Sequence, residues 1–177
     1  MRRILMTILA LMFVLPVFTA CSGKEDINVD DPVTMEQLNT EGKFAARGFI
    51  ESVFSGDRDM FYACYPEGFI DDLGKAAGID FFEQYSNTAN VSGVLVGTSS
   101  VASTDYTVEN GFDAAHMKSR ISFAAGIEYS AIEQIRLEKI TAVFKNSSEV
   151  ADTEFSVIVF KTEGSWYMFE LYKGDNV

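Results

Sequence analysis

The order of sequence patterns along the chain predicts an α+β fold, in which N-terminal helices pack on an antiparallel sheet. Apolar residues recur at helical spacing in the first half of the domain, whereas β-branched and aromatic residues dominate after Ile132. A basic, apolar leader and a polar segment come before both patterns. We therefore expect a signal peptide over residues 1–20, a tether over 21–32 and one domain over 33–177. With 47% apolar residues and 15 phenylalanines, the chain can supply one ordinary core.

The first helix is expected to begin near Asp31-Pro32, which fits a cap followed by a first-turn proline. Residues 34–37 (Thr-Met-Glu-Gln) fit a capping box just inside that start. One apolar stripe then follows at i, i+3, i+4, i+7 and i+8, formed by Ala46, Phe49, Ile50, Val53 and Phe54. Gly56 is expected to end the helix.

Shorter helices are expected next. Asp57 is a cap for a second helix that carries Met60, Phe61 and Cys64, and Pro66 starts a further helical stretch. Residues 81–85, which include two phenylalanines and a tyrosine, close the helical part of the chain.

The middle of the chain changes character. Residues 93–107 are rich in Val, Thr and Ser and are predicted to form a strand or a hairpin, and residues 111–125 return to a helix. Residues 133–145 are predicted to form one long strand with a bulge, because the apolar register slips between Leu137 and Ile140.

The last two strands, 154–161 and 165–173, are predicted to form a hairpin around Glu163-Gly164, since glycine at the second loop position suits a primed turn. The first of these strands is apolar on both faces, through Phe155, Val157 and Val159 on one side and Ile158 and Phe160 on the other. It therefore needs cover on both sides, and we expect a helix layer on one and a cavity or a partner on the other.

The leader has a specific feature at its end. Arg2 and Arg3 open an apolar run that closes with Phe18-Thr19-Ala20-Cys21. This ending resembles the lipobox of bacterial lipoproteins, with Phe18 where leucine is usual. The resemblance implies that Cys21 receives a diacylglyceryl group and becomes the mature N-terminus after cleavage. The alternatives are an uncleaved signal anchor and a cleaved signal with an incidental cysteine.

Lipidation implies an anchored protein with a soluble domain. Two or more acyl chains on Cys21 hold a protein stably at a bilayer, whereas a single chain binds only marginally. The expected location is the bacterial cell envelope, in the outer leaflet of the cell membrane, or in the outer membrane if the cell is Gram-negative. Loss of residues 1–20 removes two arginines and no acidic residue, which leaves 12 basic and 26 acidic side chains and a net charge of −14. Such a chain is expected to bind no nucleic acid.

The order of elements in the domain is similar to that of the nuclear transport factor 2-like superfamily, and more narrowly to Gram-positive lipoproteins of that type. The pieces that carry this resemblance are Ala46–Phe61 with Ser55-Gly56-Asp57, the passage Gly126-Ile127-Glu128, and Glu163-Gly164-Ser165-Trp166-Tyr167. The resemblance implies a curved sheet wrapped around a helix to leave a cone-like pocket. The superfamily contains enzymes and non-catalytic binding proteins, so the fold alone decides no activity.

Few residues offer catalytic chemistry. His116 is the single histidine, three residues after Asp113 on one predicted helix face. An exposed or half-buried histidine beside a capping acid is the simpler interpretation. We predict no metal site and no cofactor, because the chain has no His-x-x-x-His, Cys-x-x-Cys or dinucleotide motif. Polar residues that could point into a cone, or face water, are Glu51, Tyr129, Glu138 and Tyr172.

Aromatic residues are the one suggestive excess. They either form an ordinary core or line a pocket for an apolar ligand. The candidate pocket residues are Phe49, Phe54, Phe82, Phe155, Phe160, Trp166 and Phe169. The leading hypothesis is a non-enzymatic, lipid-anchored module that binds a small apolar molecule or an envelope protein. The alternatives are an isomerase- or dehydratase-type enzyme that uses the cone, and a structural module that dimerises through its sheet.

Overall fold

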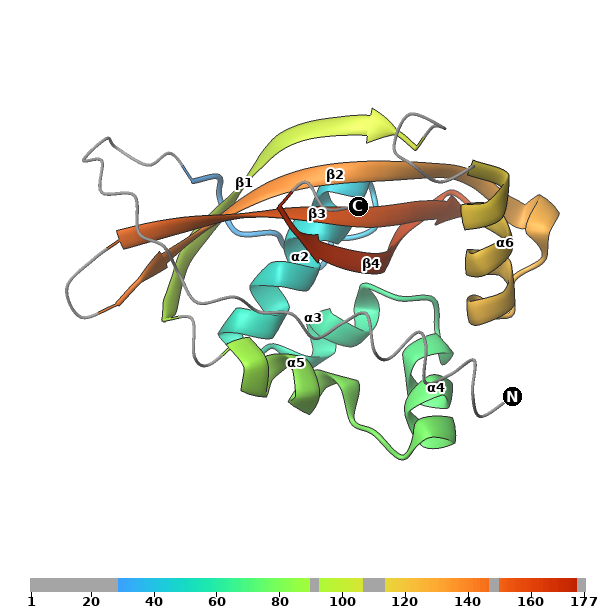
Figure 1. The fold of residues 1–177 in the computed structure, drawn as a ribbon, viewed down its shortest axis with the longest axis horizontal. Helices are drawn as coiled ribbons and strands as arrows, with labels where there is room; N and C mark the ends of the chain where they lie inside the picture. Colours follow the sequence, from blue (N-terminus) through green and yellow to red (C-terminus); the bar gives the residue numbers. More distant parts are fainter. Residues whose placement is uncertain (1–28, 90–92, 107–113, 147–149, 175–177) are drawn as a thin grey trace.

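The computed structural model describes residues 29–89, 93–106, 114–146 and 150–174. Within these ranges, helices pack on a four-stranded antiparallel sheet, so the predicted α+β class is confirmed (Figure 1). The predicted signal peptide and Cys21 lie outside the described residues. Among the described helices, none has the length and apolar character that a bilayer crossing requires.

The helical layer consists of four helices that follow one another in the chain. Their bounds are α2 Gly42–Ser55, α3 Arg58–Ala63, α4 Phe69–Ala77 and α5 Phe81–Ala89. The expected ends are confirmed: Gly56 adopts φ 79° after α2, and Asp57 caps α3 by accepting the Met60 N–H at 3.0 Å.

The expected start of the first helix is wrong. Residues 35–40 form turns, in which the Gln37 side chain accepts the backbone N–H of Thr34 at 3.1 Å. The helix itself begins at Gly42, which packs against the sheet: a Cβ added there would lie 2.5 Å from Oε1 of Glu138. Residues 34–37, which were expected to form a capping box, therefore belong to a turn that precedes the close approach of Gly42 to Glu138.

The sheet has the strand order β1-β2-β3-β4. The strands are β1 Val94–Asp105, β2 Ile132–Lys145, β3 Val150–Thr162 and β4 Ser165–Lys173, and α6 (Ala114–Ala125) and a short 3-10 turn (Tyr129–Ala131) lie between β1 and β2. The region predicted as a strand or a hairpin is thus one strand. The expected position of the bulge in β2, between Leu137 and Ile140, is wrong. The pairing of β2 with β3 shifts instead between Ile132 and Gln134, and β1 has extra residues between Leu95 and Gly97 and between Ser100 and Ala102.

The final hairpin turns as expected. Glu163 and Gly164 have φ values of 52° and 79°, and both loop positions of a type I′ turn require positive φ. The Gly164 N–H donates to Oε1 of Glu133 at 2.9 Å, which ties the turn to β2.

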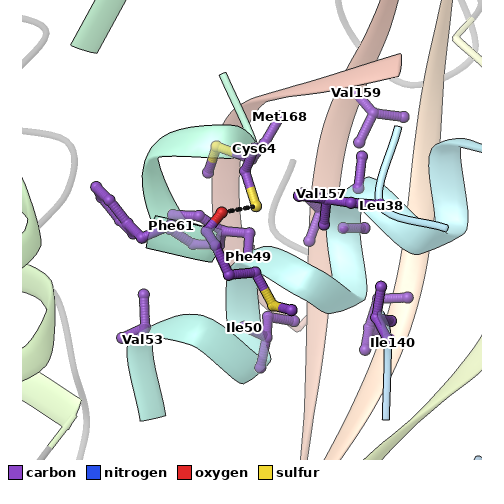
Figure 2. Close-up of a cluster of buried hydrophobic side chains, with 14 of the residues drawn as sticks. Leu38, Phe49, Ile50, Val53, Phe61, Cys64, Ile140, Val157, Val159 and Met168 are labelled. Atoms are coloured by element: carbon purple, nitrogen blue, oxygen red, sulfur yellow. Dashed lines mark hydrogen bonds between the residues drawn. The ribbon is translucent and has the colours of Figure 1, made fainter. Parts of the chain in front are cut away.

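Both faces of the sheet are covered by helices. Val157 and Val159 belong to the core under α2–α5, whereas Ile158 and Phe160 belong to a second core with Met117 and Ile121 of α6. Figure 2 shows the first core, in which the buried Cys64 thiol donates to the Met60 carbonyl at 3.2 Å. The second face of β3 is therefore covered by α6, which lies at one end of the sheet. The sequence suggested a cavity or a partner on this face.

Candidate functional site

The most elaborate polar site surrounds Arg47, where the chain enters the domain. Arg47 points from α2 toward β1 and is 3% exposed. Its Nε donates to Oγ1 of Thr98 at 2.9 Å, and its Nη2 donates to the Asp31 carbonyl at 2.6 Å. Its Nη2 also contacts Glu51, one turn further along α2, at 3.1 Å, and its Nη1 lies 3.4 Å from Asp30. A buried guanidinium is thus bonded to α2, β1 and the entering chain at once.

Glu51 completes this network from the same helix. Its Oε1 accepts the Thr98 hydroxyl at 2.5 Å, and its Oε2 accepts the Val33 N–H at 2.8 Å. The Glu51 side chain is only 12% exposed, and a cationic partner with two further donors offsets most of the cost of its desolvation. We call Arg47, Glu51 and Thr98 the entry clamp, because together they hold residues 30–33.

The entering chain crosses the outer edge of β1. The Asp30 N–H donates to the Thr98 carbonyl at 2.9 Å, and the Asp30 carboxylate accepts the Ser100 N–H at 3.2 Å. Val29 lies over Gly97, where an added Cβ would be 2.9 Å from the Val29 Cβ. Gly97 and Thr98 are neighbours on a strand and face opposite ways. The chain therefore passes from the outer sheet face, around the edge, to the helix face, and residues 29–32 of the predicted tether lie against the domain.

The candidate pocket aromatics lie in two separate cores. The first core contains Phe49, Phe54, Phe82, Phe155 and Trp166, and the second, on the opposite sheet face, contains Phe160 and Phe169.

The rings of the first core pack against one another. Phe49 lies 5.5 Å from Phe61 and 5.3 Å from Tyr85 between ring centroids, and Phe54 lies 4.6 Å from Phe144. These spacings are those of edge and tilted aromatic contacts within a filled interior. The structure thus brings five of the candidates together as packed core residues, and separates the other two from them.

The candidate catalytic residues are not brought together. His116 is exposed on α6, and its proposed partner Asp113 lies outside the described residues. Tyr129 is 44% exposed. Among the described ranges, no three His, Cys, Asp or Glu side chains converge in a way that could hold a metal ion.

Glu138 is the exception to the expectation that polar sheet residues face water. It is 0% exposed, it accepts the Ser103 hydroxyl at 2.8 Å through Oε1, and its Oε2 has no hydrogen-bond partner in the described part of the chain. Burial raises the pKa of this carboxyl, while the Ser103 hydrogen bond and the charge of Arg136 oppose that rise. The side chain lies against the start of α2, sealed from solvent.

A second polar cluster, which the sequence did not indicate, joins α6 to β4. Arg120 binds both carboxylate oxygens of Glu170, with Nη1 at 3.2 Å from Oε2, and the Tyr172 hydroxyl donates to the same carboxylate. Burial and the Glu170 carboxylate raise the pKa of Tyr172. Tyr106 is buried nearby, and its pKa is raised by burial and by the charge of Glu170. The cluster fastens α6 over the second core.

A groove of about 360 Å³ lies between α3, α4 and the start of α5. Arg58, Tyr62, Asp71, Lys75, Asp80 and Phe81 are among its lining residues, and none of the candidate pocket aromatics lines it. Arg58 forms an ion pair with Asp80 and stacks over Tyr62 at 5.6 Å from the ring centroid. The groove thus presents both charges and aromatic edges to solvent.

Signals for the entry clamp were present in the sequence. Arg47 and Glu51 are four residues apart on a predicted helix, a spacing at which opposite charges meet on one face. Arg47 also follows Ala46 of the apolar stripe directly. Its partners Asp31 and Thr98 carry no pattern that a single sequence would reveal. Comparison of the chain with known protein families, curated proteins and solved structures finds no match.

Proposed function

We propose that this protein is a lipid-anchored, extracytoplasmic binding module of the bacterial cell envelope, with a nuclear transport factor 2-like domain. The observation that carries the proposal is the entry clamp. It holds the chain from Asp30, which is nine residues after Cys21, the expected acylation site, and it joins this part of the tether to the buried polar network of the domain. A domain that is fixed to its own tether in this way stays within the reach of the few residues between Cys21 and Val29.

A binding role fits the distribution of polar groups better than catalysis does. The carboxyl with the most unusual surroundings, Glu138, is fully buried, so a substrate has no path to it in this conformation. An accessible concave feature in the described part of the chain is the groove between α3 and α5, where Arg58 and Lys75 lie beside Asp71 and Asp80. Mixed charges with aromatic edges suit a polar ligand or a segment of an envelope protein.

The anchor is tested by labelling cells with radioactive palmitate. We expect the label on the wild-type protein and on the matched control Cys64→Ser, and no label on Cys21→Ser, because Cys64 is buried and Cys21 is the proposed acceptor. Label on the Cys21→Ser protein, or none on the wild type, would refute the anchor.

The binding role is tested by affinity purification from detergent-solubilised envelopes, with native mass spectrometry of the purified protein. Arg58→Ala with Lys75→Ala should lose the bound molecule, whereas Lys118→Ala, on α6, should retain it. Recovery of no specific partner or ligand by the wild-type protein would count against this role.

The enzyme alternative rests on the raised pKa and the unpartnered oxygen of Glu138. It requires this carboxyl to become accessible. Carbodiimide activation in the presence of an amine, followed by peptide mass mapping, measures that access. Rapid modification of Glu138 in the native protein would favour an enzyme, and protection would favour the binding module.

A further inference from the structure

The outer face of the sheet carries exposed valines at the end opposite α6 (Figure 1). Val94 and Val150 both pair with Lys145 across the β1-β2-β3 ladder, and directly paired residues point to the same face. Their neighbours Leu95 and Ala151 pair with Phe144, which lies in the core under the helices. The row Val94, Lys145 and Val150 therefore faces away from the helices.

The valines of this region are unusually exposed for their type. Val94 is 74%, Val96 is 52% and Val150 is 50% exposed. We call these three residues the valine patch. Exposed apolar residues that gather in one place commonly mark an interaction surface, whereas single ones need no explanation.

The tether leaves the domain beside the valine patch. Val29, the first described residue, lies over Gly97, which is adjacent to Val96. Val94 is three residues back from Gly97 along the same strand, about 10 Å at strand rise, and Val150 lies two strands across from Val94, again about 10 Å. The patch thus lies to one side of the point at which the chain departs toward Cys21.

The length of the tether limits how far this point can lie from the bilayer. Seven residues separate Cys21 from Val29. Eight peptide steps span at most about 28 Å when fully extended, and about 16 Å on average for a flexible chain. The entry clamp fixes residues 30–33 to the domain, so these residues cannot detach and lengthen the tether.

We infer that the valine patch is the membrane-proximal face of the domain and contacts the lipid surface to which Cys21 is fastened. This inference rests on the proposed lipid anchor. The bilayer is favoured as the occupant because the tether leaves the domain beside this face and spans at most about 28 Å. Lys145 lies between Val94 and Val150, and its long side chain can extend its ammonium to the lipid phosphates while the valines meet the apolar boundary.

The test uses the full-length acylated protein with one added cysteine for a fluorescent label. Cys21 is blocked as a thioether and Cys64 is buried, so the label attaches at the new site. Val94→Cys and Val150→Cys report on the patch. Phe123→Cys is the matched control, since Phe123 is 76% exposed on α6 at the far end of the sheet. The proteins are reconstituted in phosphatidylcholine–phosphatidylglycerol vesicles that contain lipids brominated in the acyl chains.

We expect at least threefold stronger quenching at positions 94 and 150 than at position 123. Equal quenching at all three positions, or none at 94 and 150, in protein that floats with the vesicles would overturn the inference and leave the anchor intact. Protein that fails to float would refute the anchor instead. The labels at positions 94 and 150 are also examined in concentrated detergent solution without vesicles. If they are shielded from solvent there, a second copy of the chain covers the valine patch, and the lipid contact is overturned.

Discussion

Replacement of Arg47 by methionine tests whether the entry clamp stabilises the domain. The substitution keeps an unbranched side chain of similar length and removes the charge and every donor. It leaves the Glu51 carboxylate, whose side chain is only 12% exposed, without its cation. The carboxylate keeps its hydrogen bonds from Thr98 and Val33, but it loses both the charge and the hydrogen bond of Arg47.

Breaking a buried ion pair by removal of one partner costs about 3–5 kcal/mol, because a buried charge is left uncompensated. A domain of this kind has a total stability of about 5–15 kcal/mol. With a urea m-value of about 2 kcal/mol per molar, we expect the unfolding midpoint of Arg47→Met to fall by about 1.5–2.5 M. Urea unfolding followed by the fluorescence of Trp166, the single tryptophan, measures this shift.

The matched control is Lys43→Met on the same helix. Lys43 pairs with Glu41, but both side chains are exposed, at 40% and 56%, so this pair is worth at most about 1 kcal/mol. A midpoint for Arg47→Met that lies within 0.3 M of the Lys43→Met midpoint, on the order of the error of such measurements, would refute the stabilising role of the clamp.

Three further predictions follow from single contacts. Burial raises the pKa of Glu138 in the folded state. Between the unfolded-state pKa, about 4.3, and this raised pKa, the folded state binds more protons than the unfolded state. The free energy of unfolding therefore falls as the pH rises through this range. Glu138→Gln should therefore match the wild type in urea unfolding at pH 4 and exceed it at pH 8; an equal difference at both pH values would contradict this. Gly97→Val should displace Val29, which lies 2.9 Å from the added Cβ, and increase proteolysis before residue 33 severalfold, while Ala102→Val on the same strand should not. Cys64 in the native protein should react with a thiol reagent at least a hundredfold more slowly than Cys64 in the urea-unfolded protein, because burial raises the pKa of the thiol and shields the sulfur from solvent. Comparable rates would show that the core opens readily.

The parts of the fold that the sequence predicts are those determined by local chemistry. Gly56 ends a helix because a left-handed residue is needed there, and Asp57 caps the next one through a bond to a residue three positions on. The Glu163-Gly164 turn is likewise local. Each of these depends on contacts within four residues, which a single sequence displays directly.

The parts that were wrong or missed depend on distant partners. The start of α2 lies where Gly42 approaches Glu138, and the bulges on β1 show only in its pairing with β2, a strand that is distant in the sequence. Arg47 and Thr98 are 51 residues apart. Their contact has no periodicity, so no window along the chain reveals it.

The aromatic residues illustrate the same limit for the candidate site. Apolar spacing shows that a side chain such as Phe160 turns inward, but it does not show what fills the space in front of it. Whether a ring meets another ring or an open pocket depends on how the layers come together. Here α6 occupies the second face, and its Met117 and Ile121 pack in the same core as Phe160.

The backbone hydrogen bond from Asp30 to Thr98 has a consequence for a variant of the protein that lacks residues 1–33. An outermost strand with open amide and carbonyl groups is a template on which further chains can add. Asp30 occupies that template midway along β1 and places a carboxylate on it. Trimming by a surface protease after residue 33 would uncover it, so the released domain is expected to oligomerise edge to edge, whereas the intact protein stays dispersed.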